Sequence, residues 1–286
     1  RRPMSDAASG REVSNEVVLV DCSGMDPDRE NLFKYKLYGT FGLQSELYES
    51  VWDYTQYLRL AEPAYEVVVG LLEEEAGPHF VISHEYMGVP LALKTILAAD
   101  PRFRTVFHAH EVATMRPLVE ESPGHDAMFY NVMETATEAG MGVEEVFGDQ
   151  SGFYRHALVT QAQHLDAIFA VGDCVVREFR FLSPKFRSLS VELVYNGIPA
   201  EKISLEERKA AISGLQTYAE HLSGSKPDFI FTHVTRLVPS KGLWRDFQVL
   251  EHLDRIFAAN EQRGVLFILT SSAGTRSPED VARMEA

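Results

Sequence analysis

The sequence predicts an α/β protein built on a mainly parallel sheet. Three observations support this prediction: strand-like and helix-like segments alternate, a cationic loop follows one apolar run, and polar side chains follow several others. Alternating strands and helices are typical of βαβ units, in which ligands bind beyond the carboxyl ends of the strands. We therefore expect the functional site at that edge of the sheet.

Short β-branched or aromatic runs bounded by polar residues or glycine predict seven strands. They cover residues 16–22, 79–83, 105–110, 166–171, 191–195, 229–234 and 265–270. Helices are predicted at residues 62–75, 89–98, 152–164, 174–181 and 205–222. The last of these has apolar residues at helical spacing and a charged opposite face. Residues 119–150, rich in Glu and Gly, match neither pattern.

A domain boundary is predicted after residue 222, because residues 223–227 (Ser-Gly-Ser-Lys-Pro) have the composition of a linker. Residues 15–222 then form an N-terminal α/β domain, and residues 223–286 form the first, truncated part of a second domain. Residues 1–14 have the composition of a disordered leader. We therefore expect this chain to be a fragment of a longer protein.

Composition excludes several classes of function. The net charge is −15, from 27 basic and 42 acidic side chains, whereas nucleic acids and anionic membranes select a surplus of Lys and Arg. No apolar run approaches the ~18 residues of a membrane span, and no signal peptide is evident. Cys22 and Cys174 lie far apart, which favours free thiols and a cytoplasmic location.

The loop after the predicted strand 229–234 carries two cations five residues apart, Arg236 and Lys241. A predicted helix follows it, and a helix N-terminus favours anions. Arg offers a planar fork to phosphate oxygens and Lys a mobile point charge, while Gly242 permits close approach of the backbone. The loop is predicted to bind a phosphate or diphosphate; the alternative is that both cations are solvated loop residues.

Two histidine-bearing segments end neighbouring predicted strands. His108 and His110 lie on the same side of an extended segment because they are two residues apart, and Glu111 follows them. His84 and Glu85 come directly after another strand. A histidine at this edge can hydrogen-bond a sugar hydroxyl, and H-x-H on a strand is also a common metal-ligand pair. A structural role for some of these histidines is the alternative.

Asn196 and Gly197 follow the predicted strand 191–195 and form a common turn dipeptide. Taken in chain order, five segments resemble motifs of the retaining nucleotide-sugar glycosyltransferases of GT-B architecture, the group that includes glycogen synthases and sucrose-phosphate synthases. These segments are residues 80–85, 107–116, 154–172, 194–198 and 236–242. The resemblance covers residues 78–270.

This resemblance implies an N-terminal Rossmann-like domain and the beginning of a second Rossmann-like domain, which close on a nucleotide sugar. The catalytic residues that it implies are His110, Arg236 and Lys241. The donor-binding residues that it implies are Arg236, Lys241, Gly242 and Asn196. The residues that it places on the acceptor side or in the cleft are His84, Glu85, Arg116 and Gly197.

The implied reaction transfers a sugar, expected to be glucose, from a UDP-, ADP- or GDP-sugar to a carbohydrate acceptor, with retention at the anomeric carbon. An oxocarbenium-like transition state, comparable to that of glycoside hydrolysis, is expected. Stabilisation of the leaving group would supply most of the catalysis. The resemblance implies no cofactor and no metal ion, and it leaves a homo-oligomer open.

Two features depart from the pattern of the family. No Gly-rich loop follows the first predicted strand, since Gly24 stands alone there and Gly39 and Gly42 come later. The acidic E-x7-E element is absent, so this fragment is expected to be inactive by itself. Two alternatives therefore stay open: a catalytically inert GT-B module with a regulatory or assembly role, and a metal-dependent enzyme of the amidohydrolase type that uses His108, His110 and Glu111.

Overall fold

The computed structural model of the chain describes residues 18–72, 75–122, 125–197, 202–238 and 241–270. The chain divides into two compact units, Arg1–Asn196 (unit 1) and Gly197–Ala286 (unit 2). The predicted boundary after residue 222 is too late, because helix α9 (Leu205–Ser223) belongs to unit 2 and contacts its strand β5 (Phe229–Val234). Gly224 caps α9 at φ 74°, a left-handed conformation that glycine adopts readily. The linker-like composition therefore marks the end of a helix.

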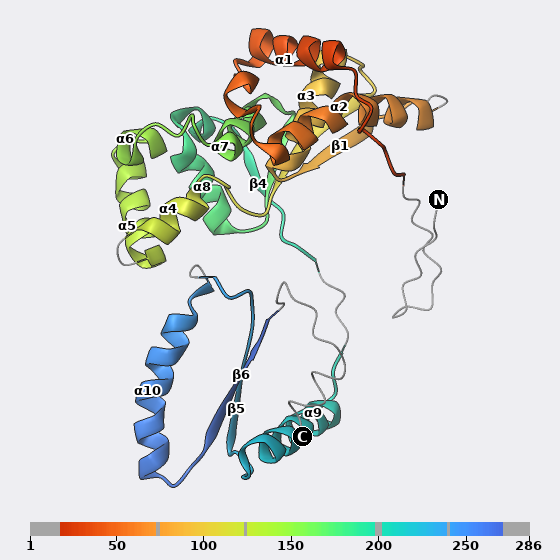
Figure 1. Cartoon of the computed structure of the whole chain (residues 1–286). Helices are drawn as coiled ribbons and strands as arrows, with labels where there is room; N and C mark the ends of the chain where they lie inside the picture. Colours follow the sequence, from red (N-terminus) through yellow and green to blue (C-terminus); the bar gives the residue numbers. More distant parts are fainter. Residues whose placement is uncertain (1–17, 73–74, 123–124, 198–201, 239–240, 271–286) are drawn as a thin grey trace. The chain divides into compact units, whose positions relative to one another are not determined.

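Unit 1 contains a four-stranded parallel sheet with the order β1-β2-β3-β4 (Figure 1). Its strands are β1 (His79–His84), β2 (Phe103–Ala109), β3 (Ala167–Ala170) and β4 (Val191–Leu193). The prediction of an α/β protein with a parallel sheet is thus confirmed. Because all four strands run the same way, their carboxyl ends meet at one edge.

Helices surround this sheet. They are α1 (Pro27–Phe41), α2 (Trp52–Leu71), α3 (Val89–Ala98), α4 (Met115–Glu121), α5 (His125–Glu138), α6 (Val143–Phe147), α7 (Tyr154–Val159) and α8 (Asp173–Leu182). Four short 3₁₀ segments complete the unit: η1 (Ser45–Tyr48), η2 (Tyr86–Gly88), η3 (Thr160–His164) and η4 (Pro184–Arg187). Helix α3 contacts β1 and β2, and α8 contacts β3 and β4. The stretch 119–150, which no pattern assigned, is largely helical.

One predicted strand is not formed. Residues 16 and 17 lie outside the described residues, and residues 18–22 have no strand partner in the described part of the chain. The side chain of Leu19 is 91% exposed, so the apolar run there has no layer to pack against. An apolar run predicts a strand only when a neighbouring strand is available to pair with it.

The core of unit 1 includes the inner strand β2. Phe107 of β2 is fully buried and meets the ring of Phe179 of α8 edge-to-face at 6.0 Å. Phe179 in turn packs against Phe186, with 5.3 Å between ring centroids. Leu93 brings α3 into the same cluster. Burying a side chain of this size contributes about 1.5–3 kcal/mol, so this cluster fixes the position of β2 within the sheet.

Unit 2 is built around two parallel strands, β5 and β6 (Gly264–Leu269), with helix α10 (Leu243–Ala259) connecting them. Helix α9 begins with a capping box: the Ser204 hydroxyl accepts from the backbone N–H of Glu207, and the Glu207 carboxylate accepts from the N–H of Ser204. No residue of α10 is buried. Among the described residues of both units, no helix is long and apolar enough to cross a membrane.

Candidate functional site

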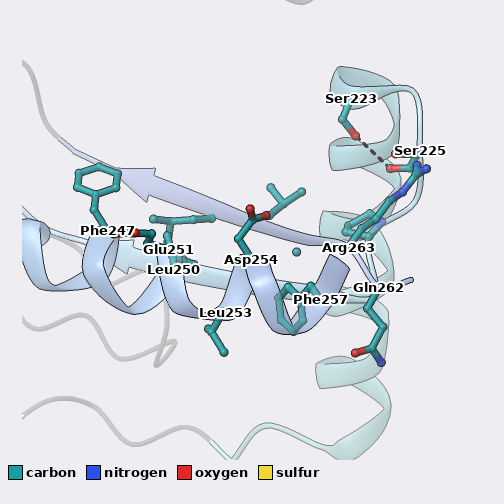
Figure 2. Close-up of a pocket in the computed structure, with 14 residues that line it drawn as sticks. Ser223, Ser225, Phe247, Leu250, Glu251, Leu253, Asp254, Phe257, Gln262 and Arg263 are labelled. Carbon is teal, nitrogen blue, oxygen red and sulfur yellow. Dashed lines mark hydrogen bonds between the residues drawn. The ribbon is translucent and has the colours of Figure 1, made fainter. Parts of the chain in front are cut away.

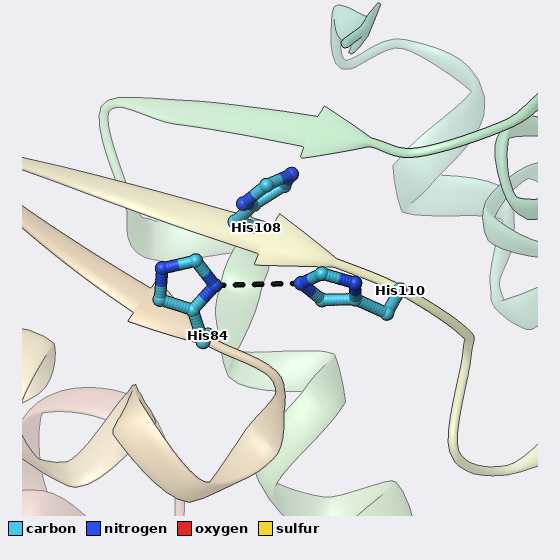
Figure 3. A group of neighbouring side chains, drawn as sticks. All are labelled: His84, His108 and His110. Atoms are coloured by element: carbon cyan, nitrogen blue, oxygen red, sulfur yellow. Dashed lines mark hydrogen bonds between the residues drawn. The ribbon is translucent and has the colours of Figure 1, made fainter. Parts of the chain in front are cut away.

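Three imidazole rings gather at the carboxyl edge of the sheet in unit 1 (Figure 3). His84 ends β1 and is the register partner of His108 in β2, so the two rings lie 5.0 Å apart between centroids. His110 follows β2 on the same side as His108, with 4.8 Å between ring centroids. The shared side that alternation predicted for His108 and His110 is therefore confirmed. His84 Nδ1 lies 3.4 Å from His110 Nε2.

Glu85 turns the chain sharply after β1. Its backbone has φ 59° and ψ −176°, a region that residues other than glycine occupy at a cost of about 1–3 kcal/mol. Three hydrogen bonds hold it there: its N–H donates to the carbonyl of His108 (3.1 Å), and its carboxylate accepts from the N–H groups of His110 and Glu111. Strain of this kind is concentrated at functional sites.

The carboxyl group of Glu85 is held close to its point of ionisation at neutral pH. Burial raises the pKa of Glu85 to about 7, although hydrogen bonds from the backbone N–H groups of His110 and Glu111 act in the opposite direction. Burial also lowers the pKa of His108, and the nearby His110 and His84 rings act in the same direction. The edge therefore combines the His108 ring, whose neutral form is favoured, with a carboxyl group that can exchange a proton.

Two carboxylates fix the backbone that carries His110. Glu85 accepts the N–H groups of His110 and Glu111, and Glu178 of α8 accepts the N–H of Val112 at 3.2 Å. Glu178 is buried and also accepts from the hydroxyl of Tyr130 at 2.7 Å. Because three consecutive N–H groups have buried or half-buried partners, the segment after β2 has little freedom to move.

Asn196 also lies at this edge, after the strand at the opposite end of the sheet from β1. It follows β4, and its side-chain amide lies 3.3 Å from His110 Nδ1. Arg116 of α4 forms an ion pair with Glu111, so it supports the segment that carries His110. Gly197 is exposed and is the first residue of unit 2.

The cationic loop lies in unit 2, between β5 and α10. Arg236 and Lys241 are both exposed, and no ion pair of either is found within the described residues. Gly242 precedes α10 at φ 69°, a conformation that favours glycine. His233 of β5 pairs with Asp246 in the first turn of α10, which ties the helix N-terminus to the strand. Pro239 lies outside the described residues.

A pocket of about 590 Å³ lies in unit 2, against α10 (Figure 2). It is lined by Phe247, Leu250 and Phe257 of α10, and by Arg263 and Gly264 at the start of β6. Gly264 is the register partner of Phe229, the first residue of β5. Arg263 and Gly264 thus line the pocket at the amino end of the two strands, whereas Arg236 and Lys241 follow the carboxyl end of β5.

The structure brings together His84, Glu85, His110 and Asn196, which come from three separate segments of the sequence. It adds His108 to this group and places Arg116 beside Glu111. Arg236, Lys241 and Gly242 lie in unit 2, between β5 and α10. The sequence interpretation missed Glu178, whose partner Val112 lies 66 residues away, and the pairing of His233 with Asp246.

No protein-family model matches this chain, and no curated protein matches its sequence.

Proposed function

We propose that the protein is a retaining glycosyltransferase of GT-B architecture that transfers a sugar from a nucleoside diphosphate to a carbohydrate acceptor. The observation that carries the proposal is the contact of His110 with both His84 and Asn196. His84 ends β1, while His110 and Asn196 follow β2 and β4, and all three belong to the motifs that carry the resemblance. Polar groups at the carboxyl edge of a parallel sheet are placed where ligands bind in such folds.

The edge of unit 1 suits the hydroxyl groups of a sugar. His84 and His110 are exposed, and a neutral imidazole can donate one hydrogen bond and accept another. A sugar hydroxyl needs both kinds of partner. In the proposed reaction His110 contacts the transferred sugar, while His84 and Glu85 line the acceptor side.

The loop of unit 2 suits the leaving diphosphate. In the proposed reaction the bond between the anomeric carbon and the diphosphate oxygen breaks, and the diphosphate leaves with the bonding electrons. The acceptor hydroxyl forms the new glycosidic bond, and its proton passes to the departing diphosphate oxygen. Arg236 and Lys241 stabilise the negative charge that develops on the diphosphate, and this stabilisation is largest in the transition state.

A metal-dependent hydrolase of the amidohydrolase type is less well supported. It expects H-x-H on the first strand of a barrel, whereas His108 lies in the second strand of a four-stranded parallel sheet in unit 1 and His110 follows that strand. It also gives no role to Arg236 and Lys241. An inert GT-B module differs from the proposed enzyme only in lacking turnover, so an activity measurement separates these two hypotheses.

The proposal is tested with the full-length natural protein that carries these residues. UDP-, ADP- and GDP-glucose are supplied separately with a glucan oligosaccharide, and NMR follows the release of nucleotide and the configuration of the new linkage. We expect one donor to be consumed and the anomeric configuration to be retained. If no donor is consumed, or if the product is inverted, the proposal is wrong.

A further inference from the structure

We propose that unit 1 binds one divalent metal ion of the zinc class through His84, His108 and His110. This inference goes beyond the proposed transfer reaction and does not rest on it, since metal binding by unit 1 is measured without any sugar donor. Its basis is the geometry of the three rings in Figure 3.

The ring nitrogens are spaced as metal ligands. One nitrogen from each ring can be chosen so that all three lie within 4.8 Å of one another. Two nitrogens bound to one tetrahedral ion at 2.0–2.1 Å lie about 3.4 Å apart, and His84 Nδ1 and His110 Nε2 are separated by 3.4 Å. This distance is long for a hydrogen bond, but it equals the separation expected between two nitrogens that bind the same ion.

The backbone holds the rings in this arrangement. The parallel register aligns His84 with His108, and the ring of Phe169, the partner of His108 in β3, lies against the other side of His108 at 6.3 Å. His110 is held by the hydrogen bond from its N–H to Glu85. A site whose ligands are fixed before the ion arrives loses little conformational entropy on binding.

His108 carries an unsatisfied polar atom at this place. Its Nε2 is buried and has no hydrogen-bond partner within the described residues. Buried polar atoms are rarely left without a partner, and those that are require an explanation such as an ion. A metal ion coordinated by the three rings would remove this deficit if Nε2 is the ligand atom.

Asn196 supports the metal-bound form of His110. Its amide lies 3.3 Å from Nδ1, and the oxygen and nitrogen of an amide can exchange places by a flip. With the oxygen toward Nδ1, Asn196 accepts the Nδ1–H hydrogen bond and leaves Nε2 free to bind the ion. Partners of this kind orient the metal-binding histidines of other proteins and strengthen their affinity.

The ligand set selects the class of ion. Three neutral imidazoles suit Zn²⁺ and, in the laboratory, Co²⁺, whereas Mg²⁺ and Ca²⁺ require oxygen ligands. Three protein ligands leave the fourth tetrahedral position open, as in catalytic rather than structural zinc sites. Since His84 and His110 are exposed, water or a hydroxyl group can reach that position.

The test uses the full chain after treatment with a chelator. Zn²⁺ is titrated by calorimetry and Co²⁺ is followed by the visible absorption of a tetrahedral site. We expect one ion per chain, and at least about 100-fold weaker binding in His84→Ala, His108→Ala and His110→Ala, because each removes a direct ligand. Two matched controls, His252→Ala on the exposed face of α10 and Cys174→Ser, are expected to bind as the wild type does.

Circular dichroism establishes that each variant is folded. The proposal is overturned if the folded wild-type chain takes up neither Zn²⁺ nor Co²⁺, whatever the variants do. It is also overturned if a folded His108→Ala variant keeps wild-type affinity, or if Cys174→Ser abolishes binding, since the ion would then be held elsewhere.

Discussion

The two units differ in how they present their polar residues. In unit 1, the histidines stand on a sheet whose core is closed by Phe107 and Phe179, and buried Glu178 holds the segment after β2. In unit 2, Arg236 and Lys241 stand on an exposed loop, and no residue of α10 is buried. In the proposed reaction, the closely held histidines of unit 1 orient the sugar, and the exposed cations of unit 2 neutralise the diphosphate.

The largest expected effect is on stability and separates the two units directly. Phe179→Ala removes a side chain that is fully buried, and we expect it to lower the free energy of unfolding of unit 1 by about 3–5 kcal/mol. The matched variant Phe247→Ala removes a ring that is 57% exposed on α10, and we expect a loss below about 1 kcal/mol. Hydrogen exchange of the backbone amides in each unit measures the loss of stability in both variants. Equal losses would show that the units do not differ in packing as described.

The second prediction concerns the dependence of stability on pH in unit 1. Burial lowers the pKa of His156 to about 4, below its ordinary value of 6.5. The unfolded chain therefore binds a proton at this residue between pH 6.5 and 4 and the folded chain does not, so stability is present above pH 6.5 and is lost as the pH falls toward 4. The expected contribution over this range is about 3 kcal/mol.

Urea denaturation at a series of pH values measures this contribution. In His156→Gln the slope between pH 6.5 and 4 should become shallower than in the wild type, whatever the absolute stability of the variant. His252→Gln, an exposed substitution on α10 of unit 2, should leave the slope unchanged. A slope in His156→Gln equal to that of the wild type would contradict the account of His156.

The third and smallest prediction links the proposed metal site to the proposed transfer reaction. Zn²⁺ bound by His84 and His110 occupies ring nitrogens that the transfer reaction uses, so Zn²⁺ should inhibit transfer and a chelator should restore it. In His108→Gln the inhibitory Zn²⁺ concentration should rise by about 10-fold or more, relative to the zinc-free rate of that variant. Inhibition that is unchanged in this variant would place the inhibitory ion elsewhere.

The sequence predicted those features that depend on residues only a few positions apart. Helix α3 has the predicted bounds, Val89–Ala98, and the alternation of side chains placed His108 and His110 on one side. The convergence of His84 and His110 followed from the general rule that parallel strands end at one edge. These features depend on periodicity and chain direction, which a single sequence carries.

Other features depend on partners that are distant in the sequence. Glu178 looks like a polar residue of an amphipathic helix, and only the folded chain shows that it accepts the N–H of Val112. The positive φ of Glu85 could not be predicted from the sequence, because glycine is the residue that usually adopts such a backbone conformation. The strand predicted at residues 16–22 is not formed, because its apolar run has no neighbouring strand among the described residues.

The most direct test of the central proposal is the rate of transfer by Arg236→Ala in the full-length natural protein. Its matched control is Arg255→Ala, which removes an exposed guanidinium of α10 that pairs with Glu251 one turn away. We predict that kcat falls by about 10²–10³-fold in Arg236→Ala, because charge stabilisation in the transition state is lost, and that it stays within about 2-fold of the wild type in Arg255→Ala. An unchanged kcat in Arg236→Ala, or an equal loss in both variants, would contradict the role given to the cationic loop.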